Sequence, residues 1–291
     1  MKNIGLTGLV LAALLSQTVC AQQVRVEQTF EKGWKFTRED QKEFSNQAFD
    51  DAKWQSVTVP HDWAIYGPFS IENDKQNLAI AQDGQKEAME HAGRTGGLPF
   101  VGTGWYRLEF EAPEFGQGKT ATLVFDGAMS HARVWLNGQE VGYWPYGYNS
   151  FHFDVTPYLK AEGTNTLAVR LENQHESSRW YPGAGLYRNV HLVINEDAYV
   201  PTWGTQLTTP EVNRDFAKVN LKTSLAFPKG KKIEDYRIVT ELKDATGKVV
   251  AKAEKQGTHY DGKGFEQDFV VDKPALWSPD SPALYTAESK I

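Results

Sequence analysis

Short stretches in which hydrophobic and polar residues alternate run along most of the chain, and helical periodicity is nearly absent beyond the first residues. Gly, Pro, Asn and Asp bound these stretches at spacings typical of β-sandwiches. We predict about eight strands before residue 200, which suits a jelly roll of two facing sheets. The strands are expected within 34–36, 56–60, 104–112, 120–128, 131–144, 151–159, 165–173 and 188–194.

Two turn signals predict hairpins. Asn137-Gly138 separates two alternating runs, and this dipeptide favours a type I′ turn, in which both central residues have positive φ. Asp244 to Gly247 predicts a second hairpin turn. The strand pattern breaks between residues 67 and 102, where we expect a large insertion with a short helix at 84–93. Loops of that length are usually functional or mobile.

The pattern changes near Pro201, after which the alternating runs are shorter and richer in charge. These runs predict a second, smaller immunoglobulin-like sandwich. We therefore expect a jelly-roll domain at 22–198 and an immunoglobulin-like domain at 199–291. Ile291 falls within an apparent strand, so we expect the second domain to be incomplete, with an open sheet edge.

Residues 1–21 have the features of a secretory signal peptide. Lys2 supplies a positive start, an apolar run follows, and Val19-Cys20-Ala21 carries the small residues at which a signal peptidase cleaves. The apolar run is too short to span a bilayer, which takes about 20 residues. We expect a soluble, exported protein in the periplasm or outside the cell. Cys20 also permits a lipoprotein interpretation, which Gln17 and Val19 fit poorly.

Composition excludes several classes of site and partner. Cys20 is the only cysteine, so cleavage after Ala21 would leave neither a disulfide nor a thiolate metal site. The formal net charge is -6 with the signs interspersed, which argues against nucleic acid and against anionic membrane surfaces. The 9 Trp and 12 Tyr residues favour a binding surface, because such rings suit places that are apolar on one side and wet on the other; all-β cores also use many aromatic residues.

Six segments, in chain order, carry a family resemblance. They are VPHDWAIYGPF (59–69), GTGWYRLEFE (102–111), FDGAMSHARVWLNGQEVG (125–142), YGYNSFHFDVTPYL (146–159), GTNTLAVRLEN (163–173) and SSRWYPGAGLYRNVHL (177–192). Together they resemble the N-terminal sugar-binding domain of glycoside hydrolase family 2, and among its members the exported β-galactosidases of Bacteroides-type bacteria. LWSPDSPALY (276–285) resembles the end of that family's immunoglobulin-like domain. The resemblance implies an all-β chain, a galactose-binding-like jelly roll followed by an incomplete immunoglobulin-like sandwich.

The resemblance also implies a reaction, the retaining hydrolysis of terminal β-galactosides by a pair of carboxyl groups. In the family both glutamates belong to a third domain, a (β/α)₈ barrel. The sequence has no strand–helix alternation that could form one. We therefore expect no catalytic residue, no metal site and no cofactor here, and expect a carbohydrate and the absent barrel as partners. A free-standing carbohydrate-binding protein and a structural remnant without ligand affinity are the alternatives.

Arg179, Trp180 and Tyr181 are the first candidates for sugar contact. A ring can pack on the apolar C–H face of a sugar, and a guanidinium donates paired hydrogen bonds to hydroxyl groups. The resemblance places this loop over the barrel mouth. Alternatively, Trp180 and Tyr181 pack between the first domain and the barrel. Gly183-Ala184-Gly185 is followed by a strand and not by a helix, so its glycines serve a tight turn and not a phosphate site.

His61, Asp62 and Asn173 are weaker candidates. The resemblance places the loop of His61 and Asp62 near the active cleft, but neighbours on a strand face opposite sides. Asp62 could instead cap the turn while Trp63 closes the end of the sandwich. Asn173 ends a strand, where an amide orients a loop or bonds to turn backbone. No spacing joins the remaining acidic and histidine candidates into a catalytic pair or a metal site; these are Asp126, Asp154, Glu172, His131, His152 and His175.

Overall fold

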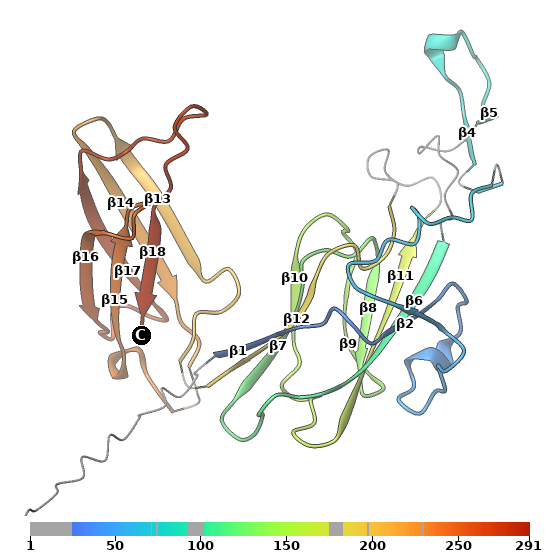
Figure 1. Ribbon diagram of the computed structural model, residues 1–291, viewed down its shortest axis with the longest axis horizontal. Coiled ribbons are helices and arrows are strands. Elements are labelled where there is room, and N and C mark those ends of the chain that lie inside the picture. Colours follow the sequence, from blue (N-terminus) through green and yellow to red (C-terminus); the bar gives the residue numbers. More distant parts are fainter. Residues whose placement is uncertain are drawn as a thin grey trace, which may run out of the picture.

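The computed structural model describes residues 25–70, 72–73, 75–91, 100, 102–174, 183–196, 198–227 and 230–291. Its regular structure is almost entirely β-strand, in two sandwiches that follow one another along the chain (Figure 1). The predicted fold class, a jelly roll followed by an immunoglobulin-like sandwich, is confirmed. Within the described ranges, no helix has the length and apolar character needed to cross a bilayer.

The first sandwich packs a four-stranded sheet, in the order β1-β12-β7-β10, against a six-stranded sheet, in the order β3-β2-β6-β11-β8-β9. All of these neighbours pair antiparallel. The smaller sheet consists of β1 (Arg25–Thr29), β7 (Thr120–Phe125), β10 (Phe151–Asp154) and β12 (Val190–Asn195). The larger consists of β2 (Trp34–Thr37), β3 (Gln55–Val57), β6 (Gly102–Glu111), β8 (Ala132–Leu136), β9 (Gln139–Trp144) and β11 (Thr164–Asn173).

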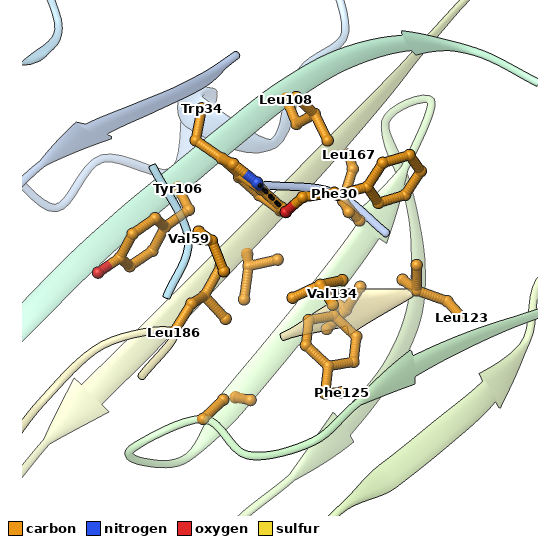
Figure 2. Packing of buried hydrophobic residues seen from close by; sticks show 14 of the residues in the cluster. Phe30, Trp34, Val59, Tyr106, Leu108, Leu123, Phe125, Val134, Leu167 and Leu186 are labelled. Carbon is orange, nitrogen blue, oxygen red and sulfur yellow. Dashed lines mark hydrogen bonds between the residues drawn. The ribbon is translucent and has the colours of Figure 1, made fainter. Parts of the chain in front are cut away.

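The core of the first sandwich follows from the two-residue period of its strands. In β7 the buried positions are Ala121, Leu123 and Phe125, and the residues between them face outward. Figure 2 shows part of this core, where the indole N–H of Trp34 donates a hydrogen bond of 2.9 Å to the carbonyl oxygen of Phe30. The one polar atom of that indole is therefore satisfied inside an otherwise apolar cluster.

A second layer covers the outer face of the six-stranded sheet. The segment that contains the 3-10 helix η1 (Lys42–Ser45) packs Phe44 against Trp105 of β6. Arg107, wholly buried, lies on the same face and donates from Nε to Asp51 Oδ2 at 2.7 Å. Its Nη1 donates to the carbonyl oxygen of Phe44, also at 2.7 Å. One guanidinium thus ties this covering segment to the sheet.

The second sandwich pairs two three-stranded sheets, in the orders β13-β14-β17 and β16-β15-β18. Its core consists of small apolar clusters: one contains Leu221, Leu242 and Phe269, and another contains Leu225, Ile238 and Phe265. A 3-10 helix, η3 (Ile233–Asp235), precedes β15. The strands are β13 (Thr205–Val212), β14 (Phe216–Ser224), β15 (Arg237–Lys243), β16 (Val249–Gln256), β17 (Gly264–Asp272) and β18 (Thr286–Lys290).

Both predicted hairpin turns are confirmed. Asn137 and Gly138 have φ values of 53° and 82°, as a type I′ turn requires, and they join β8 to β9. In the second sandwich, Asp244 Oδ1 accepts the backbone N–H groups of Thr246 and Lys248 at 2.9 and 3.1 Å, and the turn joins β15 to β16.

The helix predicted at 84–93 is wrong for the residues that the structure describes there. The 3-10 helix η2 (Ala81–Asp83) ends at Gly84, whose φ of 77° turns the chain back. The strand β5 (Met89–His91) then pairs with β4 (Gln76–Leu78), and this hairpin projects from the first sandwich (Figure 1). An ion pair of 2.6 Å between Lys75 and Glu90 spans the hairpin. Pairing with a strand earlier in the chain outweighed the local helix propensity.

Candidate functional site

Two segments that are far apart in the sequence pair along their backbones where β6 begins and β11 ends. The N–H of His61 donates to the carbonyl oxygen of Leu186 at 2.7 Å, and the N–H of Trp63 donates to that of Ala184 at 3.0 Å. Gly185, between these two residues, has a φ of +118°, and a Cβ there would lie 2.4 Å from the carbonyl oxygen of His61. Only glycine fits this close approach, as the tight-turn interpretation predicts.

Asp62 joins the same two segments through its side chain. It is nearly buried, and its Oδ1 accepts the backbone N–H of Ala64 at 2.9 Å and that of Ala184 at 3.0 Å. The first bond caps the local turn, in agreement with the capping interpretation, and the second holds the neighbouring loop. Hydrogen bonds to a charged acceptor are each worth about 1.5–3 kcal/mol, so this carboxylate is a substantial structural link.

Asn173 approaches the same loop from the end of β11. Its side chain is almost completely buried, and Nδ2 donates to the carbonyl oxygen of Gly183 at 3.2 Å. Residues 183 and 184 are therefore held by Asn173 and by Asp62, two of the candidates predicted from the sequence. The structure brings His61, Asp62 and Asn173 together at the base of one loop. The other three candidates, Arg179, Trp180 and Tyr181, lie outside the described residues.

His61 is paired with a buried phenol. Its Nδ1 lies 2.7 Å from the hydroxyl oxygen of Tyr106, which is inaccessible to solvent. Burial raises the pKa of Tyr106 well above its usual value of 10.0, so the phenol stays protonated. Burial also lowers the pKa of His61 from 6.5, an effect that the charge of Asp62 partly opposes. The pair is therefore a neutral hydrogen bond at neutral pH.

Tyr66 adds an exposed ring to this site. It is 73% exposed and stacks on His61, with ring centroids 6.0 Å apart and planes inclined by 16°. A cavity of about 560 Å³ opens beside the two rings and is also lined by Lys32, Gln55, Ser56 and Thr58. An aromatic face beside polar side chains is an arrangement that can bind a sugar.

Sequence analysis missed Tyr66 and Tyr106. Both lie in segments that carry the family resemblance, 59–69 and 102–111. The alternation of residues in those segments does not say which ring is buried beneath His61 and which one covers it. The signal that was present is the density of aromatic residues in VPHDWAIYGPF, where Tyr66 follows the two candidates by only a few positions.

Arg38 supports the loop that carries Tyr66. Its Nη2 donates to the carbonyl oxygen of Gly67, and its guanidinium lies 5.0 Å from the ring centroid of Phe100. Partial burial lowers the pKa of this guanidinium, which nevertheless keeps its charge. Ile65 and Phe69 in the same loop are largely exposed, so a polar cavity lies next to an apolar surface. Among the described residues, no three His, Cys, Asp or Glu side chains are arranged to hold a metal ion.

Comparison with known proteins identifies relatives for both sandwiches. The family model described as "Glycosyl hydrolases family 2, sugar binding domain" matches residues 28–195, and "Glycosyl hydrolases family 2" matches residues 204–291. A β-galactosidase of Bacteroides ovatus is 36% identical over 97% of this chain. A putative β-glucuronidase of Formosa agariphila is 34% identical over 97% of it.

A solved structure supports the same relationship. A glycosyl hydrolase family 2 member from Bacteroides cellulosilyticus superimposes with a TM-score of 0.76 at 31% identity, over 90% of this chain. The chain spans only part of each relative: 31% of the B. ovatus protein, 25% of the F. agariphila protein and 33% of the solved chain.

Proposed function

This chain belongs to glycoside hydrolase family 2, and we propose that it forms the non-catalytic N-terminal part of a retaining hydrolase of terminal β-galactosides. In this role it contacts the sugar and supports a catalytic domain supplied by further sequence. The observation that carries the proposal is the convergence of His61, Asp62 and Asn173 on one loop base, beside the exposed ring of Tyr66.

Burial separates the roles of the residues in this site. Asp62 and Asn173 are buried and hold backbone groups of residues 183 and 184, which closely follow the candidates Arg179, Trp180 and Tyr181 in the sequence. Tyr66, among the described side chains that line the cavity, offers an exposed aromatic face to a ligand. We propose that the three loop residues complete the sugar contact begun by this ring.

The exposed apolar side chains of Ile65 and Phe69 support a second role for the same loop. Large apolar side chains grouped beside a polar cavity mark interaction surfaces. We propose that they pack against the catalytic domain, which places the cavity beside the substrate. Barrel domains carry their active sites at the C-terminal ends of their strands, and we propose that this loop packs at that end.

Galactose is the proposed sugar because the B. ovatus relative, at 36% identity, is a β-galactosidase. A putative β-glucuronidase follows at 34%, so a glucuronide belongs in any test. A free-standing carbohydrate-binding protein is the second candidate, favoured by the same ring and cavity. We also propose that residues 1–21 direct export, which mass spectrometry of the N-terminus of the exported protein tests.

The test combines hydrolysis and binding. The purified chain is incubated with chromogenic β-galactoside and β-glucuronide, and galactose binding is measured by calorimetric titration. We expect no hydrolysis, together with galactose binding that Tyr66→Ala weakens and Tyr260→Ala does not. Tyr260 is the matched control because it is 87% exposed and belongs to the second sandwich. The proposal would be contradicted if the purified chain itself hydrolysed either glycoside. It would also be contradicted if neither Tyr66→Ala nor Tyr260→Ala changed galactose binding.

A further inference from the structure

A second cavity, of about 550 Å³, lies between the two sandwiches on the outer face of the four-stranded sheet. The core of the first sandwich takes Ala121, Leu123 and Phe125 of β7, so Val124 and Asp126 face this cavity. Glu27 of β1 and His191 of β12 lie on the same face and complete its floor. The turn at 200–205 and side chains of the second sandwich form its walls.

Trp203 gives this cavity an exposed aromatic wall. Its side chain is 65% exposed although the indole is among the largest apolar groups in proteins. Its backbone has a φ of 58°, in the left-handed region that is unfavourable for a bulky residue, within a turn closed by the N–H of Gly204 donating to the carbonyl oxygen of Pro201 at 2.8 Å. Strain of this kind persists where the surrounding structure holds it and often accompanies a ligand site.

The neighbouring strand orients that indole without covering it. The imidazole of His152 on β10 meets the indole of Trp203 edge to face, with ring centroids 5.1 Å apart and planes inclined by 76°. This single ring contact fixes the indole beside the sheet, while most of its surface stays open. Packing alone therefore does not explain an exposed tryptophan at a strained position.

The floor of the cavity is a connected set of polar groups. Nε2 of His191 lies 3.1 Å from Oδ2 of Asp126, and Nδ1 lies 2.9 Å from Oγ1 of Thr29. The same Nδ1 of His191 also lies 3.6 Å from Glu27 Oε1, and Glu27 Oε2 lies 3.3 Å from Arg25 Nη2. Each carboxylate has about four lone-pair positions, so both can still accept hydrogen bonds from a ligand after making these contacts.

We infer that this cavity is an accessory binding site for a neutral pyranose. The indole of Trp203 packs on the C–H face of the sugar, and the carboxylates of Asp126 and Glu27 accept hydrogen bonds from adjacent hydroxyl groups. A uronic acid is disfavoured because its carboxylate would face those of Asp126 and Glu27, and the guanidinium of Arg25, which also lines the cavity, already pairs with Glu27. The volume lies within the range of small-molecule sites, about 300–1,000 Å³. The site is separate from the cavity at His61 and does not depend on the proposed function.

Nuclear magnetic resonance tests the site directly, because the indole N–H of each tryptophan gives its own signal. The ¹⁵N-labelled chain is titrated with methyl β-galactoside, and the Trp203 signal is assigned by its loss in Trp203→Ala. We expect a saturable shift of the Trp203 signal and none of the Trp277 signal, since Trp277 is 59% exposed but lies outside this cavity. A Trp203 signal that does not move, or that moves linearly together with that of Trp277, would overturn the inference.

Substitutions separate this site from the one at His61. Trp203→Ala should weaken binding at this site by about tenfold, as followed by the His191 ring protons, while Trp277→Ala leaves it unchanged. Methyl β-glucuronide should bind more weakly than the galactoside. Tyr66→Ala should leave the Trp203 shift intact even if it abolishes binding at the His61 cavity. Loss of the Trp203 shift in Tyr66→Ala, or equal binding of the two glycosides, would count against the accessory site.

Discussion

Oδ1 of Asp62 lies 3.0 Å from the backbone nitrogen of Ala184, and this one hydrogen bond joins two loops that are 122 residues apart in the sequence. The same oxygen accepts the N–H of Ala64 at 2.9 Å, so a single carboxylate satisfies a local turn and a distant one. The residues proposed to contact the sugar, Arg179, Trp180 and Tyr181, precede Ala184 by only a few positions in the sequence. The geometry of the backbone at residues 64 and 184 therefore depends on a side chain that is itself almost inaccessible to solvent.

Removal of this carboxylate should destabilise the first sandwich. Asp62→Ala leaves two buried N–H groups without this acceptor, and we expect the free energy of unfolding to fall by about 2–4 kcal/mol. Asp154→Ala is the matched control, because Asp154 accepts the N–H of Thr156 at 2.9 Å in an exposed turn. That change should cost less than about 1 kcal/mol. Urea unfolding followed by tryptophan fluorescence measures both; equal losses would argue against a structural role for Asp62.

The His61–Tyr106 pair predicts a dependence of stability on pH. Burial lowers the pKa of His61 below 6.5 in the folded protein, so the unfolded chain takes up this proton first as the pH falls. The stabilising contribution is complete above the unfolded pKa and is lost as the pH falls through the folded pKa. The thermal midpoint of the protein should therefore decrease below pH 6.5 more steeply than that of His61→Gln. Parallel pH profiles for the two proteins would contradict the assignment.

Close packing around Trp63 predicts a steric effect. A Cβ at Gly104 would lie 2.5 Å from Cζ3 of Trp63 and 2.9 Å from Cε2 of Phe36, in the stacked pair that fills this end of the core. Gly104→Ala should therefore lower the free energy of unfolding by about 1–3 kcal/mol. Gly116→Ala provides the control, since a Cβ there meets nothing within 4 Å. Denaturant midpoints compare the two, and an unaffected Gly104→Ala protein would show that Trp63 is free to move.

Because the guanidinium of Arg107 is buried, its ion pair with Asp51 should contribute far more to the free energy of unfolding than the exposed pair of Arg133 and Glu140. Asp51→Ala leaves this buried charge without its carboxylate partner and should cost about 3 kcal/mol or more. Glu140→Ala breaks the exposed pair of Arg133 and Glu140, 2.7 Å apart, and should cost about 1 kcal/mol or less. The prediction is wrong if equilibrium unfolding gives similar values for the two substitutions.

The alternation of hydrophobic and polar residues and the turn residues predicted the parts of the fold that depend on neighbouring residues in the sequence. The hairpin at Asn137 and the strands of the first core were predicted because turn chemistry and a two-residue period leave a direct trace in the sequence. The polar strand β1 (Arg25–Thr29) was not predicted, because its sequence is mostly polar and its partner β12 lies far along the chain. The helix expected at 84–93 failed for a different reason: β5 (Met89–His91) pairs with β4 (Gln76–Leu78), which lies just outside the segment whose helical pattern was considered.

In the candidate site, individual residues could be predicted from the sequence but the contacts between them could not. His61, Asp62 and Asn173 were each predicted separately from the sequence. Their residue types indicated hydrogen bonding to backbone groups or to a ligand at strand ends. Their common contact with residues 183–186 is a long-range arrangement that spacing does not encode. Burial of Tyr106 beneath His61 and exposure of Tyr66 above it also depend on the folded sheet, so the sequence could not assign their different roles.

We propose that this chain binds a β-galactoside without cleaving it. Saturation-transfer proton NMR of the purified chain with methyl β-galactoside measures both properties in one sample. We expect saturation transfer to the ring protons of the intact glycoside, weakened by Tyr66→Ala, and no release of methanol over prolonged incubation. Accumulation of methanol and free galactose, or the absence of any saturation transfer at millimolar glycoside, would contradict it.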